Sequence, residues 1–313
     1  MNSRFGSLEN CALDIPADDG ISCLMETHHL PLDRSPSSNV AKTPSTGAPS
    51  PASINDTYLR RLLVLLAVRL LRLSQKRSVL RLYPWLCIKY GESRELSEAR
   101  TLQFVRQHTS IPTPKVYCAF ERKGITYIVM KRLRGRSLAV SWKNLSDSSR
   151  GKILHRLREL VLEMRSVPAP GNEIAGVDGG TLWDCRLPCG LERFGPFADN
   201  DDFHRFLRNG VDEAPPGYPD ITEMIQLQKQ EWGSPVLTHG DLSSLNIMVH
   251  KGDITGIIDW ETSGWWPPYW EYTTAHQVNP RNMFWAEHID QFLDPWPEAL
   301  KMEKIRQRWW GDF

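Results

Sequence analysis

Three polar residues in the segment LTHGDLSSLNIMVHKGDITGIIDWE, positions 237–261, have types and spacing suited to phosphoryl transfer. Asp241 is followed five residues later by Asn246, and Asp259 stands where the return strand of a predicted hairpin ends. Phosphoryl transfer needs a carboxylate to orient a hydroxyl and accept its proton, oxygen ligands for Mg²⁺, and a cation for the nucleotide phosphates. The segment predicts the first two.

An Asp and an Asn separated by four residues also occur often by chance, so the context of the pair carries the prediction. His239 and Gly240 precede Asp241, and a hairpin turning at 252–253 follows Asn246. The structural alternative is that the two aspartates cap helices and the asparagine occupies a turn.

The predicted cation is Lys89, which ends the apolar strand WLCIKYG. A lysine that leaves a sheet beside a cleft suits nucleotide phosphates, provided that a carboxylate holds it in place. Glu98, in the helix that follows, is the expected partner, and Glu95 is its competitor one turn earlier. The alternative is a solvated lysine at the end of a strand.

The elements that must position these residues are predicted from periodicity. The stretch SVLRLYPWLCIKYG alternates as two short strands broken at Tyr83-Pro84, ESRELSEARTLQFVRQHT has helical spacing, and VYCAFERKGITYIVMKRL gives two strands around Lys123-Gly124. Beyond Ser137 the chain is mostly helical, with DSSRGKILHRLRELVLEMRSV strongly amphipathic. No internal repeat is present.

This order predicts an α+β fold of two lobes, a small antiparallel sheet with one main helix and a larger, mostly helical lobe. A ligand is expected in the cleft between them. We predict four segments: a disordered Ser/Pro-rich tail (1–55), a Leu-rich helix (56–77), a nucleotide-binding lobe with a hinge (78–133), and a helical lobe with the catalytic loop and acceptor site (134–313).

The uninterrupted apolar run of the Leu-rich helix, residues 62–68, is too short to span a bilayer, which takes roughly 20 residues. Its basic residues fall on one narrow stripe, and the rest of its circumference is apolar. We expect a mostly buried helix that packs on the following lobe. A basic helix lying on a membrane surface through 59–76 is the alternative.

Composition excludes several classes of protein. The formal net charge is +1, from 38 Lys+Arg and 37 Asp+Glu, so nothing in the total charge favours nucleic acid as a partner. The N-terminus lacks the apolar stretch of a secretory signal, and the six cysteines lack the paired spacing of a zinc site. A cytoplasmic location is therefore expected.

Taken in order, Lys89, Glu98, TYIVMKRLRGRSL, HGDLSSLNI and IIDWE resemble the aminoglycoside phosphotransferase and choline kinase branch of the protein-kinase-like fold. The chain is most similar to the fungal phosphotransferase enzyme family, with HTSIPTPKVY, GPFADNDDFHRFL and IIDWETSGWWPPYWEY as supporting matches. The resemblance covers residues 78–313.

The resemblance implies transfer of the γ-phosphoryl group of ATP, with Mg²⁺, to a small molecule. By motif position, Asp241 would be the catalytic base, and Asn246 and Asp259 would bind Mg²⁺. Lys89 would hold the nucleotide phosphates, with Glu98 orienting it. The hinge would contact adenine largely through its backbone, at Met130, Lys131 and Leu133.

The sequence departs from the family pattern before Lys89. No Gly-rich loop precedes this lysine, and LSQKRSVLRLYP stands in its place. A Leu-rich helix also occupies the stretch where the first lobe would be completed. Both departures favour a rival hypothesis, a kinase-like protein that binds ligand without catalysing transfer.

The acceptor site is expected between 140 and 235 and after Trp260. Residues 184–223 carry nine acidic residues against four Arg, a balance of −5, which would suit a cationic acceptor, such as an amino sugar or a choline-like amine. The alternative is a solvated surface. The aromatic residues between 260 and 272 would be core or a cation–π cage. Glu261, Trp265 and Trp266 are the acceptor contacts that we predict.

A protein kinase is the third hypothesis. Gly240 replaces the arginine that precedes the catalytic aspartate there, DWE replaces DFG, and no Ala-Pro-Glu segment follows Asp259. These differences favour a small-molecule acceptor. The oligomeric state does not follow from the sequence.

Overall fold

The computed structural model describes residues 52–71, 78–91, 96–187, 193–277 and 280–311. Nearly all of the predicted tail, residues 1–51, lies outside the described residues, and so do residues 72–77 of the predicted Leu-rich helix and Glu95.

The first lobe is a four-stranded antiparallel sheet in the order β1-β2-β4-β3. Its elements are β1 (Val79–Tyr83), β2 (Leu86–Gly91), α2 (Ser97–His108), β3 (Val116–Arg122) and β4 (Ile125–Lys131). The strand break at Tyr83-Pro84 and the turn at Lys123-Gly124 are where the sequence predicts them. Both turn residues have positive φ, 53° and 71°, as a two-residue hairpin turn requires.

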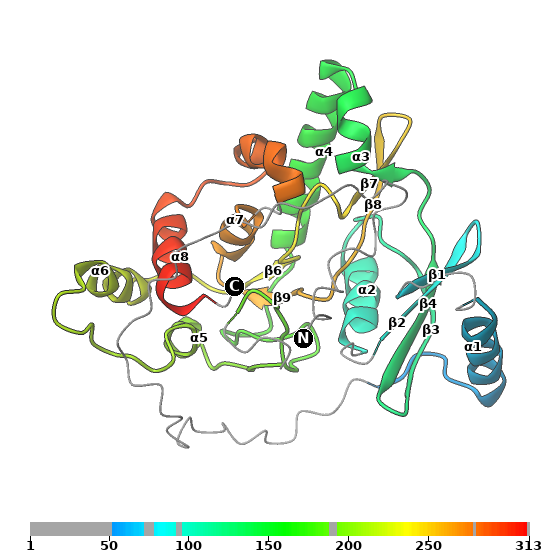
Figure 1. Cartoon of the computed structure of the whole chain (residues 1–313), viewed down its shortest axis with the longest axis horizontal. Helices are drawn as coiled ribbons and strands as arrows, with labels where there is room; N and C mark the ends of the chain where they lie inside the picture. The colour runs from blue at the N-terminus through cyan, green and yellow to red at the C-terminus, as the bar shows by residue number, and fades with distance from the viewer. Residues whose placement is uncertain (1–51, 72–77, 92–95, 188–192, 278–279, 312–313) are drawn as a thin grey trace, which may run out of the picture.

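Successive residues of these strands face opposite sides, so the sheet has two apolar faces. Cys87 and Met130 belong to the core that α2 covers, whereas Ile88 and Val129 belong to the core beneath α1 (Tyr58–Leu71). Figure 1 shows the sheet between the two helices. Lys89, two residues after Cys87, therefore points to the α2 side.

The prediction that the Leu-rich helix is mostly buried is wrong. Val64 and Val68 of α1 are buried against the sheet, but its outward face exposes five leucines, by 52–63%. These are Leu59, Leu62, Leu63, Leu66 and Leu70. A single sheet face covers only one side of a helix, so a helix that is apolar all round keeps a second apolar side in solvent.

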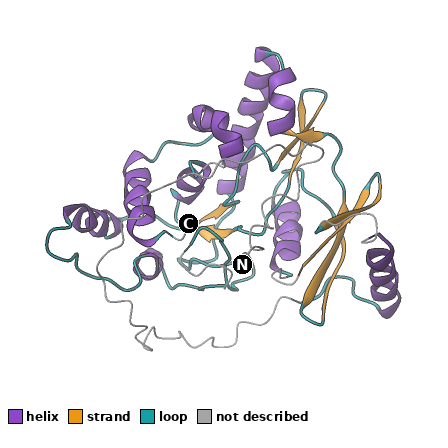
Figure 2. Ribbon diagram, viewed as in Figure 1, coloured by secondary structure: helices purple, strands orange, loops and turns teal. Residues whose placement is uncertain are grey.

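The second lobe is mostly helical, and short strands interrupt it (Figure 2). Its helices are α3 (Leu138–Ser141), η1 (Trp142–Asn144), α4 (Asp147–Arg165), α5 (Asn200–Leu207), α6 (Pro219–Gln228), α7 (Trp270–Ala275), η2 (Pro280–Gln291) and α8 (Pro297–Trp310). Its strands are β5 (Arg136–Ser137), β6 (Val236–Thr238), β7 (Ile247–His250), β8 (Asp253–Ile257) and β9 (Gly264–Trp266). The α+β, two-lobed fold class predicted from the sequence is confirmed.

Two small sheets position the polar residues of the 237–261 segment. The β7–β8 hairpin pairs with β5, and β6 pairs with β9. The residues that connect β6 to β7 and β8 to β9 therefore leave these sheets side by side, next to α2 and β2. Among the described residues, none of the helices combines the length and the apolar character needed to cross a membrane.

Candidate active site

Lys89 contacts three carboxylates, and two of them, Asp259 and Glu261, join it to the second lobe. Its Nζ lies 2.8 Å from Glu98 on α2, 2.5 Å from Asp259 and 3.0 Å from Glu261. The lysine and Glu98 side chains are only 5% and 4% exposed, so the pair is shielded from water. The structure thus pairs Lys89 with Glu98; Glu95 is not among the described residues.

The cluster around Lys89 carries three negative charges and one positive charge. One oxygen from each of Glu98, Asp259 and Glu261 lies within 4.8 Å of the others, a spacing that suits a metal ion. Hard carboxylate oxygens are the ligands that Mg²⁺ prefers, and the surplus of two negative charges matches a divalent cation. Glu261 is therefore beside the predicted phosphate and metal groups, whereas the sequence placed it with the acceptor.

Asp241 and Asn246 lie in the loop between β6 and β7 and contact each other directly. The Asn246 side-chain amide Nδ2 donates to the Asp241 carboxylate at 2.8 Å and to its backbone carbonyl at 2.9 Å. Since this places the amide nitrogen toward Asp241, the side-chain oxygen Oδ1 of Asn246 is the atom that could bind a metal ion. Burial of the Asp241 carboxyl raises its pKa, and the charge of Asp259 adds to this effect.

The two loops of the site are bonded to each other through the backbone. The Ile258 amide donates to the Asn246 carbonyl at 3.0 Å, and His239 Nε2 contacts the Ile258 carbonyl, also at 3.0 Å. Asp259 follows with φ of +65°, a conformation that is uncommon outside glycine. Such backbone strain persists where the surroundings fix it and gathers at functional sites.

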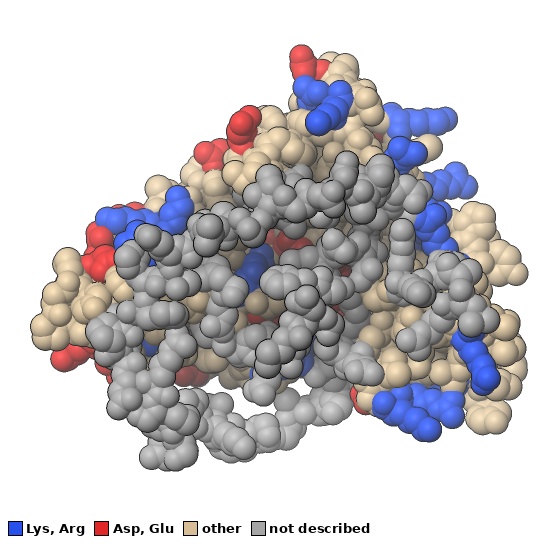
Figure 3. Space-filling model, viewed as in Figure 1, with Lys and Arg blue, Asp and Glu red and all other residues tan. Residues whose placement is uncertain are grey.

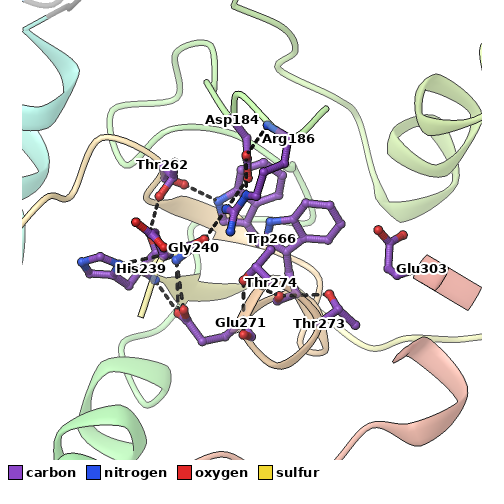
Figure 4. A network of polar contacts seen from close by, with 12 residues as sticks. Asp184, Arg186, His239, Gly240, Thr262, Trp266, Glu271, Thr273, Thr274 and Glu303 are labelled. Atoms are coloured by element: carbon purple, nitrogen blue, oxygen red, sulfur yellow. Dashed lines mark hydrogen bonds and ion pairs between the residues drawn. The ribbon is translucent and has the colours of Figure 1, made fainter. Parts of the chain in front are cut away.

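Glu271, at the start of α7, holds the loop that carries Asp241 from below (Figure 4). Its buried carboxylate accepts the backbone amides of His239 at 2.6 Å and Gly240 at 3.1 Å. The His239 ring accepts the Asp241 amide at Nδ1, and burial lowers the pKa of this histidine, so the neutral ring fits both contacts. Sequence reasoning missed Glu271, whose aromatic neighbours give no sign of this role.

Gly240 is required by space as well as by backbone conformation. Its φ is +81°, and a Cβ atom at this position would lie 2.8 Å from the Thr262 carbonyl oxygen. Thr262 in turn donates its hydroxyl to the His239 carbonyl at 2.9 Å. The residue before Asp241 therefore cannot carry a side chain.

Arg186 is the second residue that sequence reasoning missed. Its Nη2 donates to the Gly240 carbonyl, and its positive charge lowers the pKa of Asp241, against the effect of burial. From the sequence alone, Arg186 counts only among the charges of 184–223. Its contact with Gly240, 54 residues away, leaves no signal in the local sequence.

The hinge region follows β4. The backbone amides of Lys131 and Arg132 donate to the carbonyls of Lys115 and Trp85, at 2.8 and 2.9 Å. The Leu133 amide makes no hydrogen bond within the described part of the chain. Of the predicted hinge residues, Leu133 thus has a backbone donor free for a ligand, while Met130 is 7% exposed and lies in the sheet.

Trp265 and Trp266 do not fit the acceptor contact predicted for them. They are 3% and 0% exposed, and Trp266 stacks on Trp270 at 5.0 Å between ring centres. The Trp266 indole nitrogen donates to the Thr262 carbonyl. Their burial corrects the prediction and favours the alternative, in which the aromatic residues form core beneath the metal-binding loop.

In the described part of 184–223, several carboxylates have structural partners and are not free to form an acidic wall for a cationic acceptor. Asp199 caps α5 by accepting the Asp202 amide, and Asp212 pairs with Arg205 and Arg208. Asp220 pairs with Arg308, and Glu223 pairs with Lys301 on α8. These contacts favour the solvated-surface alternative.

A family model described as the phosphotransferase enzyme family matches residues 56–302 of the chain. No curated protein matches the sequence. Among solved structures, a thermostable mutant of aminoglycoside phosphotransferase APH(4)-Ia, in its apo form, matches with a TM-score of 0.50 and 15% identity, covering 74% of this chain and 79% of that one.

A second solved structure is aminoglycoside phosphotransferase APH(3'')-Id from Streptomyces rimosus, in complex with ADP and streptomycin. It matches with a TM-score of 0.48 and 15% identity, covering 81% of this chain and 98% of that one. At 15% identity, the likeness to the APH(4)-Ia structure shows the fold alone.

Proposed function

Because the chain belongs to the phosphotransferase enzyme family, we propose that it transfers the γ-phosphoryl group of ATP, with Mg²⁺, to a hydroxyl of a small molecule. The observation that carries this proposal is the convergence of Lys89, Asp241 and Asp259. They come from β2 and from two separate loops, and the contacts described above hold them in one site.

Asp241 has the position and the surroundings of a general base. Asn246 holds the Asp241 carboxylate by one hydrogen bond, so an acceptor hydroxyl can be oriented against it. In the reaction, the acceptor oxygen bonds to the γ-phosphorus, the bond from that phosphorus to the bridging oxygen of ADP breaks, and the hydroxyl proton passes to Asp241.

Asn246 and Asp259 are the residues that we assign to Mg²⁺, with Glu261 as an additional carboxylate beside them. When bound, the ion neutralises the charge that develops on the transferred phosphoryl group. Lys89 faces the same region and would hold the nucleotide phosphates, because Glu98 fixes its direction. The free Leu133 amide supports a backbone contact to adenine at the hinge.

The proposal is tested by ATP turnover with Mg²⁺ against a panel of sugars, amino sugars, amines and alcohols, comparing the wild-type chain with Asp241→Ala. We expect turnover with at least one acceptor and its loss in the variant, while calorimetry still detects ATP binding. If the wild type binds ATP but transfers to nothing in the panel, the binding-protein hypothesis is favoured. Equal turnover of the variant and the wild type would show that Asp241 is not the base.

A further inference from the structure

The residue before Asp241 supplies no cation, because Gly240 cannot hold a side chain. In protein kinases, an arginine occupies the corresponding position before the catalytic aspartate. Here Arg186, from the segment before α5, brings a guanidinium to the same backbone. Its Nη2 donates to the Gly240 carbonyl from 54 residues earlier in the chain.

The guanidinium of Arg186 is fixed by the Asp184 carboxylate, whose hydrogen-bond partners among the described residues all belong to Arg186. Asp184 is fully buried and receives Arg186 Nε at 2.7 Å and Nη2 at 2.6 Å, and its Oδ1 also accepts the Arg186 backbone amide at 3.0 Å. Figure 4 shows the pair directly above Gly240. A two-pronged contact of this kind sets direction as well as distance.

We propose that Arg186 is a positioning residue of this site, which fixes the backbone of the loop at Gly240 and places a positive charge beside Asp241. Asp184 holds Arg186 in that position. The inference rests on the proposed phosphotransferase function and adds two residues to it. The lowering of the pKa of Asp241 by Arg186 agrees with it.

The experiment compares Arg186→Ala, Arg186→Lys and Asp184→Asn with Arg193→Ala. Arg193 is a matched control, since its guanidinium bonds to the Thr181 hydroxyl at 2.8 Å and to the Thr181 carbonyl. The probes are MgATP binding by calorimetry and MgATP hydrolysis with water as acceptor. We expect Arg186→Ala to lower the hydrolysis rate by about 100-fold, the scale of a misplaced catalytic group, with the Kd for MgATP within about threefold of wild type.

Added guanidinium chloride, at concentrations that leave the wild type folded and active, should restore part of the rate of Arg186→Ala. It should not change Arg193→Ala. Arg186→Lys keeps the charge but loses the two-pronged contact that a guanidinium makes, so it should retain only part of the wild-type rate. A rate equal to wild type in Arg186→Ala would overturn the inference. A fall in the hydrolysis rate of Arg186→Ala that guanidinium chloride does not rescue, and that parallels a fall in thermal stability, would also overturn it, because that result shows a structural role only.

If the wild type neither binds nor hydrolyses MgATP, the proposed function fails, and hydrogen exchange of residues 240–246 tests the positioning role separately. We expect faster exchange in Arg186→Ala than in Arg193→Ala. Equal exchange in the two variants would overturn the positioning role.

A second, independent observation is the exposed apolar face of α1. At about 100° per residue, its five exposed leucines and Tyr58 fall on one continuous side of the helix, opposite Val64 and Val68. Tyr83 and Trp85 add exposed aromatic rings at the tip of the β1–β2 hairpin, 58% and 56% exposed. Exposed apolar surface of this extent marks an interaction site.

The charges near this face select the occupant. The exposed residues Arg60, Arg69 and Arg81 lie on α1 and β1, and Glu121 is the one exposed acidic residue in the described part of 52–133. On the side of the molecule with α1 and the sheet, Figure 3 shows many Lys and Arg side chains and few Asp or Glu. A second copy would bring like charges together, whereas anionic lipid headgroups would be complementary.

We infer that α1 docks on an anionic membrane surface, with its leucines entering the headgroup boundary. The test is co-sedimentation of the full chain with vesicles of phosphatidylserine and phosphatidylcholine, or of phosphatidylcholine alone. We expect binding to the anionic vesicles that weakens with salt, and a loss of at least about tenfold in Leu62→Glu/Leu66→Glu. Leu162→Glu, at an exposed leucine of α4, is the control and should bind as wild type does.

Equal binding of the double variant and the wild type, or no binding to anionic vesicles, would overturn this inference. Light scattering in the absence of lipid identifies the competing occupant. A dimer that Leu62→Glu/Leu66→Glu converts to monomer would assign the face to a second copy of the chain and would likewise overturn the membrane assignment.

Discussion

The Lys89 ammonium lies 2.5 Å from the Asp259 carboxylate, although 170 residues separate them in the chain. One comes from the sheet of the first lobe and the other from the loop after β8 in the second. Together with the contact of Lys89 to Glu261 at 3.0 Å, this pair ties the lobes together at the site where we propose that nucleotide binds, while Glu98, at 2.8 Å, holds Lys89 from within the first lobe. Each residue should therefore affect both stability and nucleotide binding.

Replacing Lys89 by Met should remove the cation from the proposed phosphate site. Glu98, Asp259 and Glu261 would lose the cation that they share, so we also expect a loss of stability, of about 3 kcal/mol or more, as for breaking a buried ion pair. The measurements are the Kd for MgATP by calorimetry and the free energy of unfolding in urea. Lys115→Met, at an exposed lysine of the same lobe, is the control and should leave both unchanged. MgATP affinity equal to wild type in Lys89→Met would remove Lys89 from the nucleotide site.

Asn246→Ala should raise the Mg²⁺ concentration needed for half-maximal ATP turnover. The increase should be at least about tenfold, because even residues one step removed from a metal ion give losses of that size. The measurement is an Mg²⁺ titration of the turnover rate at fixed ATP. Asn144→Ala, at an exposed asparagine, should titrate like wild type. An unchanged Mg²⁺ requirement in Asn246→Ala would exclude the amide as a ligand.

Gly240→Ala tests the packing of the loop before Asp241. The new methyl group would lie 2.8 Å from the Thr262 carbonyl oxygen, so either the loop before Asp241 or the connection between β8 and β9 must move. The control is Gly210→Ala, which has a similar φ of +75° and nothing within 4 Å of the added atom. The control should lose only about 1–2 kcal/mol, the cost of the left-handed conformation. Gly240→Ala should lose more and should also lose turnover; equal losses in urea unfolding would refute the steric argument.

His204 should make stability fall in mild acid. Its ring contacts the Gln228 carbonyl and the Tyr269 hydroxyl, and burial lowers its pKa from 6.5 to about 4. Between these values the unfolded chain binds more protons than the folded one, so stability is fully present above 6.5 and is lost as the pH falls toward 4.

The measurement is the free energy of unfolding in urea at two pH values, for wild type and His204→Asn. Between about pH 7.5 and pH 5, His204 should account for a loss of about 2 kcal/mol that the variant lacks. His155→Asn, at an exposed histidine of α4, should keep the wild-type dependence. The same pH dependence in wild type and His204→Asn would contradict the assignment.

Much of the fold follows from short-range pattern. Alternation in 79–91 and 116–131 predicts the strands and their turns, and helical spacing predicts α2 and α4, because period and turn chemistry are local properties. The same local pattern misjudged α1. Its sequence is apolar on all sides, and only the number of elements available to cover a helix decides whether all of those sides are buried.

The sequence by itself determined which residue types could perform phosphoryl transfer: the spacing of Asp241, Asn246 and Asp259 and the position of Lys89 are written in the chain. Tertiary structure decided which groups meet. It placed Glu261 at Lys89 and brought Arg186 to the Gly240 carbonyl, and it buried Trp265 and Trp266 as core. Such contacts join segments that are far apart in the chain, and they depend on how helices and sheets pack, so no local pattern could have predicted them.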